Sequence, residues 1–564
     1  MNMVFLLIST LISATSVTIT WPAEGETYSG DWLMLKAIVE NENEIPDSVH
    51  YELNGQAPMM VSRLNTDWYT YMANDSRTGY SEASAPHTSE ILWARAISGN
   101  FHEFVSPVIV DGRVYYSSEM YETTYCLDAA TGDDIWRFED IGDPIDDAVH
   151  VEDGRVYLAS DSIWCLDALT GDRIWAYAED EPGGFKGPPV PHEGRIFASG
   201  LYIHALEAST GERIWRTTDL LETASSMTAW NDMLFVPEIM SSEACLYALN
   251  TDDGEIVWSY ETYYGFWDSS PCLVDSVIYI GSAGDEKMYA FDALSGSVIW
   301  ELPIGTIEST PACDGCRVIF GAYSTVYSVD PLNGDTEWEF TIPDGHILHG
   351  SPGIADGLVF WGDFNYFSSD SIAVIHAVDL SSGQEVWNHQ TIGGTQGIQS
   401  SPAITDGVMY IAATDSMLYA FGTGLKYTYR EEYFYADVGA NELIVTSFDD
   451  GSAAAADTIN FTVTQTGLTV DPQNRLQLSV SPNPFTSSTA ISFHLPEPRM
   501  TRIEIYDLSG RLVHTLSNAE MAEGEHVLSW DGTADNGNAV STGLYMCRVQ
   551  AGGVTETTGL CLLR

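Results

Sequence analysis

The chain has 564 residues, enough for several domains, and carries 81 acidic against 22 basic side chains, for a formal net charge of −59. A surface this acidic repels phosphate backbones and anionic membranes, which argues against nucleic acid as a partner. The composition fits either a protein kept soluble in salty surroundings or an acidic secreted protein with no special need for salt.

Residues 1–14 read as a signal peptide. An apolar run from Val4 to Ile12 is followed by the small residues Ser13 and Ala14, although no basic residue precedes the run. The run is too short to span a bilayer as a helix, and no later stretch is apolar for long enough. The sequence therefore predicts an exported protein, secreted or on the outer cell surface, whose mature form lacks a transmembrane segment.

A short β module is predicted for residues 15–65, where apolar strands alternate with turns. It resembles the first half of a bacterial immunoglobulin-like (Ig-like) domain, and residues 425–470 resemble the last strands of the same kind of domain. Each stretch of about fifty residues is short for a sandwich of roughly 100. Either the two form one split sandwich around the intervening region, or they are independent modules.

The intervening region, residues 66–424, repeats one phrase. LDAATGDDIW at 127–136 returns as LDALTGDRIW at 166–175, and five further versions follow. A period of about forty residues built from short strands is typical of a β-propeller. The tryptophans that close the copies, together with one upstream, are Trp93, Trp136, Trp175, Trp215, Trp258, Trp300, Trp338 and Trp387.

Each repeat reads as four strands. In the first, Asp111 and Gly112 form a pair that tolerates the positive φ angles of a two-residue hairpin. In the second hairpin Asp128 caps the turn, while Gly132 accepts the left-handed conformation. The closing Trp136 is then expected to dock on the neighbouring blade, where full burial of such a ring contributes roughly 2–3 kcal/mol.

The innermost strands number eight, and they begin near Val105, Asp147, Gly187, Ser225, Ser269, Ser309, Gly350 and Ser400. The eighth unit ends without a tryptophan strand, whereas residues 91–96 form such a strand without the rest of a unit. Pairing residues 91–96 with residues 417–421 closes the ring and removes both open edges. The fold class is therefore predicted as all-β, an eight-bladed propeller with flanking Ig-like sandwich modules.

The pattern A-x-D-x-x-T-G-x-x-x-W resembles the tryptophan-docking motif of pyrroloquinoline quinone (PQQ)-type propellers. That family contains quinoprotein dehydrogenases and an outer-membrane assembly lipoprotein without a cofactor, and residues 67–81 are similar to the lead-in of many such propellers. For an enzyme, the resemblance implies a disulfide between adjacent cysteines, a calcium ion and an aspartate base. No two cysteines are adjacent in this sequence, so neither a catalytic residue nor a cofactor is predicted.

A candidate ligand row follows from aligning the innermost strands on their hairpin turns, because alternate residues of these strands face the central channel. Asp268, Glu308 and His349 stand side by side in it, as a divalent-cation trio or as part of a solvated polar rim. The second reading is preferred, and no metal is predicted. The row comprises Phe104, Asp146, Lys186, Ala224, Asp268, Glu308, His349 and Gln399.

The tail, residues 471–564, reads as another antiparallel sandwich. Its segments SPNPF, IYDLSGRLV, WDG and STGLYMCRV resemble the C-terminal sorting domain of type IX secretion cargo, and the resemblance implies the type IX machinery as a partner. Asp531, Asp535 and Asn536 are better explained by turns than by calcium binding.

The eight cysteines leave several pairings open. Cys126 and Cys165 are expected to be buried spacers, and Cys245 and Cys272 have no evident partner. Cys313 and Cys316 form either a strained disulfide or two free thiols. Cys547 and Cys561 are able to pair if the last two strands are neighbours.

Two functions therefore remain. The first is a noncatalytic propeller that binds an extracellular protein, glycan or small molecule. The second is a PQQ- and calcium-dependent oxidoreductase working outside the inner membrane.

Overall fold

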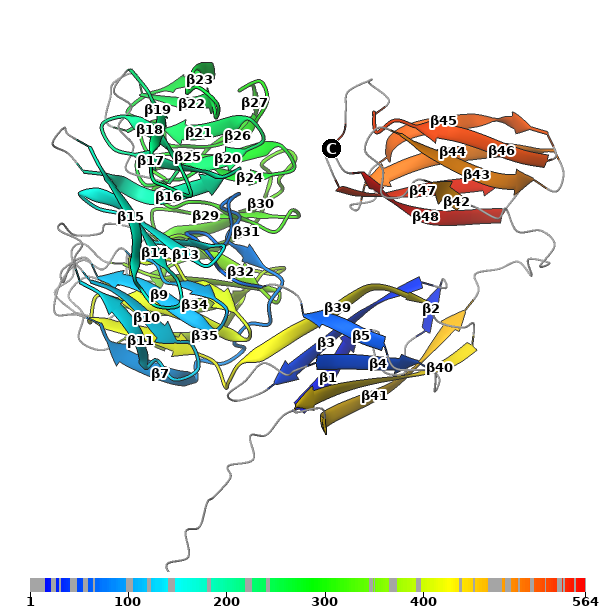
Figure 1. Ribbon diagram of the computed structural model, residues 1–564, viewed down its shortest axis with the longest axis horizontal. Coiled ribbons are helices and arrows are strands. Elements are labelled where there is room, and N and C mark those ends of the chain that lie inside the picture. The colour runs from blue at the N-terminus through cyan, green and yellow to red at the C-terminus, as the bar shows by residue number, and fades with distance from the viewer. Residues whose placement is uncertain are drawn as a thin grey trace, which may run out of the picture. The chain divides into compact units, whose positions relative to one another are not determined.

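The computed structural model shows an all-β protein (Figure 1): within the described residues, every long regular element is a β-strand. The described residues are 16–21, 27–29, 32–40, 48–53, 59–63, 66–97, 105–118, 123–139, 148–179, 184–218, 226–239, 244–343, 348, 350–364, 373–391, 397–435, 439–449, 452–464, 479–481, 488–495, 498–507, 512–522, 524–534, 540, 543–551 and 554–562.

Eight antiparallel sheets form the propeller, as predicted. Blades one to four are β8 (Val108–Val110), β9 (Arg113–Ser118), β10 (Thr123–Asp128), β11 (Asp134–Phe138); β12 (His150–Glu152), β13 (Arg155–Ala159), β14 (Ser162–Asp167), β15 (Arg173–Ala178); β16 (Lys186–His192), β17 (Arg195–Ser199), β18 (Ile203–Glu207), β19 (Arg213–Arg216); and β20 (Thr228–Trp230), β21 (Met233–Pro237), β22 (Ala244–Asn250), β23 (Ile256–Thr262).

Blades five to eight follow the same order. They are β24 (Cys272–Val274), β25 (Val277–Ser282), β26 (Lys287–Asp292), β27 (Val298–Pro303); β28 (Ala312–Cys313), β29 (Val318–Ala322), β30 (Thr325–Val329), β31 (Thr336–Thr341); β32 (Gly353–Ala355), β33 (Leu358–Gly362), β34 (Val374–Asp379), β35 (Glu385–Gln390); and β36 (Ala403–Thr405), β37 (Val408–Ala413), β38 (Met417–Phe421), β7 (Ile91–Ala96).

The ring closes through its last sheet. Strand β7 pairs antiparallel with β38, so that Trp93 lies opposite Ala420 and Ala96 opposite Met417. The N-terminal end of the propeller thus supplies the outermost strand of the final blade. This pairing confirms the predicted blade number and closing strand, and it leaves no sheet of the ring incomplete.

The first hairpin of most blades follows the predicted turn chemistry. Asp111 and Gly112 have φ angles of 49° and 70°, and the same pair of positive angles recurs at residues 153–154, 193–194, 356–357 and 406–407. Blade six differs. There Asp314 Oδ1 accepts hydrogen bonds from the amides of Cys316 and Arg317, which holds a longer loop.

Each docking indole contacts the next blade. Seven of the eight Nε1–H groups donate to backbone carbonyls of the following blade at 2.9–3.0 Å, the acceptors being Ala129, Ala168, Ala208, Thr251, Ala293, Pro331 and Leu380. The eighth, from Trp387, donates at 2.9 Å to the carbonyl of Pro86, which precedes the closing strand β7. The seven rings also lie on the turn glycine of the following blade, and a Cβ on Gly171 would meet Trp136 at 2.7 Å. Glycine is therefore required there by both its positive φ and the close approach of the indole.

The two flanking β segments share one sheet. Strands β1 (Ser16–Trp21), β2 (Thr27–Ser29), β3 (Trp32–Glu40), β4 (Ser48–Leu53) and β5 (Met59–Arg63) join β39 (Lys426–Tyr435), β40 (Gly439–Asp449) and β41 (Ser452–Thr464). Strand β39 lies between β3 and β5, and β40 lies between β4 and β41. The propeller is thus inserted between two halves of one sheet.

The C-terminal residues 464–564 form a separate compact unit with two antiparallel sheets. One sheet contains β42 (Ser479–Ser481), β43 (Thr489–Leu495) and β46 (Gly524–Trp530); the other contains β44 (Arg499–Asp507), β45 (Leu512–Met521), β47 (Gly543–Ala551) and β48 (Val554–Leu562). Their core includes Phe493, Ile505 and Trp530. Asp531 Oδ1 accepts hydrogen bonds from the amide and hydroxyl of Thr533, as a turn residue does, while residues 535 and 536 lie outside the described ones.

The cysteines whose side chains are described are all free thiols: Cys126, Cys165, Cys245, Cys272, Cys313, Cys316 and Cys547. Cys126 and Cys165 are buried, and Cys313 and Cys316 form no bridge. Strands β47 and β48 are neighbours, but their register places Cys547 opposite Thr558 and Cys561 opposite Leu544. This offset explains why Cys547 does not pair with Cys561.

Candidate functional site in the central channel

A belt of buried hydroxyl groups links the innermost strands of neighbouring blades. The amide of Ser270 in blade five donates to Thr310 Oγ1 in blade six at 2.9 Å. Equivalent bonds join blade four to five, six to seven, seven to eight, and eight to one. The complete chain of donors and acceptors is Ser226, Ser270, Thr310, Ser351, Ser401 and Ser106. All six are at most 4 % exposed. The belt therefore ties six blades together around the channel.

The belt is absent from blades two and three for a reason visible in the sequence. Ala148 and Pro188 stand at the positions that hold hydroxyl residues elsewhere. Neither side chain has an oxygen that could accept a hydrogen bond from a backbone amide of the preceding blade.

The lead-in segment, residues 66–85, crosses the channel and bonds to the innermost strands. Trp68 forms a two-way backbone bridge with Ile109 in blade one. Five more blades donate a backbone amide hydrogen bond to a carbonyl of the segment. The donor and acceptor are Val151 and Tyr69 for blade two, Leu273 and Ser76 for blade five, Cys313 and Thr78 for blade six, Ile354 and Gly79 for blade seven, and Gly407 and Ser84 for blade eight. Strand β6 (Tyr80–Ser81) pairs parallel with β32 in blade seven. The segment thus occupies the hairpin end of the channel.

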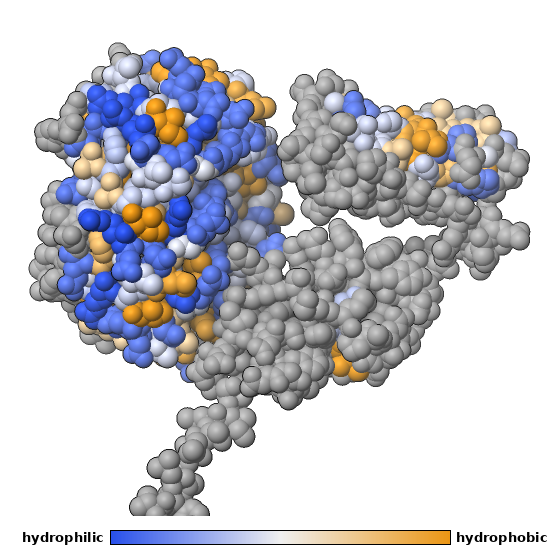
Figure 2. All heavy atoms as spheres, viewed as in Figure 1, coloured by the Kyte–Doolittle hydropathy of each residue, from blue (hydrophilic) through white to orange (hydrophobic). Residues whose placement is uncertain are grey.

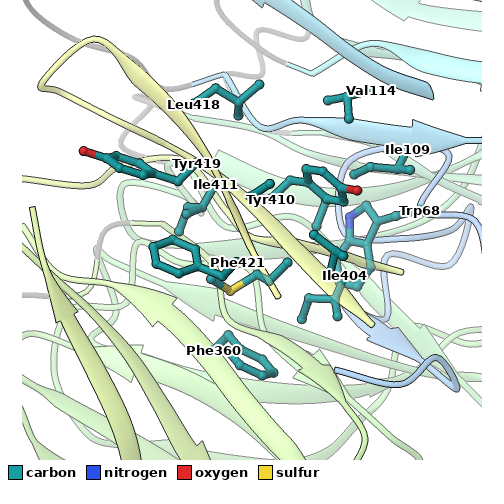
Figure 3. Packing of buried hydrophobic residues seen from close by; sticks show 14 of the residues in the cluster. Trp68, Ile109, Val114, Phe360, Ile404, Tyr410, Ile411, Leu418, Tyr419 and Phe421 are labelled. Carbon is teal, nitrogen blue, oxygen red and sulfur yellow. The ribbon is translucent and has the colours of Figure 1, made fainter. Parts of the chain in front are cut away.

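Buried side chains hold the lead-in segment in place. Trp68 is 1 % exposed, and Figure 3 shows its indole beside Ile404, Tyr410 and Ile109. The hydroxyl of Tyr71 hydrogen-bonds with two members of the belt, Thr310 at 3.2 Å and Ser351 at 2.9 Å. The lead-in segment and the belt are therefore one connected structure.

A buried polar cluster lies where the lead-in segment meets blades two to four. Arg77 is fully buried, and its guanidinium donates to Thr70 Oγ1 at 2.7 Å and to the Met227 carbonyl at 3.3 Å. Burial raises the pKa of the Asp75 carboxyl, and the positive charge of Arg77 partly opposes that rise. The amide of Asp75 also donates to the Tyr69 hydroxyl at 3.3 Å. Burial, with the nearby Asp75 charge, raises the pKa of Tyr69 to about 12.

His150 on β12 belongs to the same cluster. Its ring is fully buried, lies edge-on to Tyr69 at 5.6 Å, and has Glu152 Oε2 4.0 Å from Nε2. Burial, and then the charge of Arg77, hold its pKa well below the usual value. The imidazole is therefore neutral in the folded protein at neutral pH.

Replacing His150 with phenylalanine is expected to reduce the loss of stability on acidification. Because the folded-state pKa is lowered, the unfolded chain takes up a proton first as the pH falls below about 6.5, and stability present at neutral pH is lost. A phenyl ring fills similar space beside Tyr69 and does not titrate. Urea midpoints at pH 7.5 and 5.5 should differ less in the variant than in the wild type. Equal pH dependence of the variant and the wild type would contradict the expectation.

Half of the candidate ligand row falls on described residues. Lys186 and Asp268 are exposed, Glu308 is half-buried and Gln399 is buried at 4 % exposure, while residues 104, 146, 224 and 349 lie outside the described ones. Asp268 and Glu308 stand five residues before Leu273 and Cys313, whose amides donate to carbonyls of the lead-in segment. The role of the row stays a prediction.

Gln399 differs from a solvated rim residue. In blade seven, a Cβ on Gly350 would meet the Gln399 carbonyl at 2.9 Å, so the two innermost strands approach closely there. This close approach buries Gln399. Within the described residues, no group of three or more His, Cys, Asp or Glu side chains is placed to hold a metal ion.

The belt and the route of the lead-in segment were missed by the sequence reasoning. One signal for the belt is present: a hydroxyl residue precedes proline at 106–107, 270–271, 310–311, 351–352 and 401–402. Proline also removes an amide donor from a strand edge that faces the channel. The lead-in segment carries no comparable repeat, because each of its residues meets a different blade.

These sheets, docking indoles and closing strand define a PQQ-like β-propeller repeat protein. The family model described as outer membrane protein assembly factor BamB (PQQ_2) matches residues 78–186, 165–389 and 322–426, more than half of the chain. The chain therefore belongs to this PQQ_2 family. A model described as FlgD Ig-like domain matches residues 480–553 and identifies the C-terminal unit as Ig-like.

Curated relatives match parts of the chain. Tetrathionate hydrolase of Acidithiobacillus ferrooxidans is 27 % identical over 213 residues, covering 34 % of this chain and 41 % of the relative. Outer membrane protein assembly factor BamB of Yersinia pestis is 27 % identical over 195 residues, covering 31 % and 48 %. The chain thus matches less than half the length of each of these relatives.

Solved structures share the fold. A europium-containing methanol dehydrogenase superposes with a TM-score of 0.52 at 14 % identity, over 64 % of this chain and 98 % of that one. The quinohemoprotein alcohol dehydrogenase of Comamonas testosteroni gives 0.51 at 16 % identity, over 67 % and 82 %. At these identities the likeness shows the propeller fold alone. Of the described residues, none lies in a helix long and apolar enough to cross a membrane.

The residues do not fit the quinone site that the resemblance implies for an enzyme. That site needs adjacent cysteines, which the sequence lacks. The resemblance also implies a set of calcium ligands, and within the described residues no three His, Cys, Asp or Glu side chains are grouped to hold a metal ion. No chemical step is therefore derived through a quinone or a metal.

Proposed function

We propose that this protein is a secreted or cell-surface propeller that acts as a noncatalytic binding or scaffold module. The lead-in segment carries this proposal. Its backbone is bonded to six blades and its Trp68 and Arg77 side chains are buried, so the chain itself fills one end of the channel. A propeller with one end of its channel filled in this way offers its outer faces and loops to a ligand.

A protein is the favoured class of ligand. The family model carries the name of an assembly factor, and rigid propeller faces suit large partners better than they suit small molecules that need an enclosed pocket. The strongly acidic surface, of which Figure 2 shows one largely hydrophilic propeller face, favours partners with basic surfaces.

Export through type IX secretion is part of the proposal. It is supported by the tail segments SPNPF, IYDLSGRLV and STGLYMCRV, and by the Ig-like model that matches the same region. The test is fractionation of the native cells with mass spectrometry of the mature C-terminus. We expect the propeller outside the cell and the tail removed after export. An intact tail in the cytoplasm would refute this route.

A quinoprotein oxidoreductase is the second candidate, because the structural neighbours include dehydrogenases. Purified full-length protein is incubated with PQQ and calcium and assayed for dye-linked alcohol and sugar oxidation. The binding-module proposal predicts neither a bound-quinone spectrum nor turnover. Turnover that depends on added quinone would replace the first candidate with the second.

A further inference from the structure

Three aromatic side chains project from the loop between β23 of blade four and β24 of blade five. Tyr263 is 58 % exposed, Tyr264 43 % and Trp267 38 %. The rings of the two tyrosines meet edge to face with centroids 4.6 Å apart. Large aromatic surfaces gathered within five residues and left open to solvent are typical of an interaction site.

Contacts with blades four and five fix the backbone of the loop. Gly265 forms a β-bridge with Ile239, and Phe266 is fully buried among the side chains of blades four and five. The amide of Tyr263 donates to Asp285 Oδ1 at 3.1 Å. Because the backbone is fixed before binding, little conformational entropy is lost when the rings are covered.

Two of the aromatic residues stand in an unfavourable backbone conformation. Tyr264 and Trp267 have φ angles of 59° and 47°, in the left-handed region that bulky residues seldom adopt. Glycine or asparagine would form such a turn with less strain. The backbone strain at Tyr264 and Trp267 therefore lowers the stability of the fold while it keeps these two rings exposed.

The stretches of chain on both sides of the loop are acidic. No lysine or arginine occurs in the sequence between Arg216 and Lys287, and Lys287 is itself paired with Glu301 at 3.0 Å. Glu261 and Asp268, which flank the aromatic residues, are exposed. Aromatic faces beside carboxylates attract cationic groups through both cation–π and charge–charge interactions.

We propose that residues 261–268, the end of β23 and the aromatic loop that follows it, form the docking surface for a basic segment of a partner protein. Lysine or arginine side chains lie on the faces of Tyr263, Tyr264 and Trp267, and their charges are balanced by Glu261 and Asp268. The inference rests on the proposed function and names the class of partner and the face that it meets. A neutral glycan stacking on the same rings is the competing occupant, and the experiment separates the two.

The test uses full-length protein and a fluorescein-labelled hexa-arginine peptide, with binding followed by anisotropy. At 0.5 M NaCl, where general attraction to an acidic surface is screened, the variant Tyr263→Ala/Tyr264→Ala/Trp267→Ala should bind at least about tenfold more weakly than wild type. Tyr264→Phe keeps the ring and should stay within about twofold. Leu332→Ala, which removes an apolar side chain 82 % exposed in another blade, should bind as wild type does. Circular dichroism confirms that each variant is folded.

Two results would overturn the inference. One is equal peptide binding by wild type and the triple variant, and the other is ring-dependent binding of maltohexaose without binding of the peptide. Either result leaves the propeller a binding module. Quinone-dependent turnover, in contrast, would remove the proposed function whatever the peptide does.

Discussion

Replacing Trp175 with alanine is expected to lower the free energy of unfolding of the propeller by about 3–5 kcal/mol. The indole is 8 % exposed and donates to the Ala208 carbonyl at 3.0 Å. It also covers Gly211, where an added Cβ would lie 2.5 Å from the ring. Truncation leaves a cavity between blades two and three and removes the donor to a buried carbonyl. Urea unfolding followed by circular dichroism measures the change.

The neighbouring residue provides the control. Ile174 lies on the same strand but is 45 % exposed, so Ile174→Ala should change the unfolding free energy by only about 0.5 kcal/mol. Similar losses in the two variants would show that strand propensity, rather than docking on the next blade, determines the effect at this position.

Arg77→Met is expected to destabilise the propeller by about 3–5 kcal/mol, as loss of one partner from a buried charged network does. The change removes the hydrogen bonds to Thr70 and Met227 and the positive charge that offsets burial of Asp75. The lead-in segment then loses its side-chain attachment to blade four. The urea midpoint, together with protease sensitivity of residues 66–85, measures the effect.

A double variant tests the electrostatic part of this argument. Arg77→Met/Asp75→Asn removes both charges and should recover part of the stability lost in Arg77→Met, because no uncompensated carboxylate stays buried. Arg77→Lys keeps the charge and should lie between wild type and Arg77→Met. No recovery in the double variant would mean that lost packing and hydrogen bonds account for the whole effect.

The architecture of the ring was predictable from the sequence because its signals are local and repeated. A turn aspartate, a glycine and a tryptophan recur within each unit, and the unit that lacks its last strand indicates how the ring closes. The pairing of Ile91–Ala96 with Met417–Phe421 follows from that count alone. The sheet shared by β3, β5 and β39 depends on contacts between residues far apart in the sequence. For this reason the sequence did not distinguish one split sandwich from two independent modules.

The channel was harder to predict because its contacts join different blades. The amide of Ser351 donates to the hydroxyl of Ser401 in the following blade. The recurring hydroxyl–proline pairs mark these positions in the sequence, but they do not show that the bond joins two different blades. Tyr71 reaches two blades that lie more than two hundred residues further along the chain. The candidate ligand row was located by strand alternation alone, which gives no information about how closely neighbouring strands approach, as Gln399 and Gly350 illustrate.

The propeller is inserted into the sheet formed by β1–β5 and β39–β41, and the position of this insertion affects how the chain transmits force. Strand β5 leads into the propeller and β39 leads out of it, and the two are hydrogen-bonded neighbours, with Tyr429 opposite Arg63 and Arg430 opposite Ser62. Tension applied between residues 16 and 464 therefore runs through the ladders of this sheet and bypasses the ring. We expect such tension to shear those ladders before any blade separates.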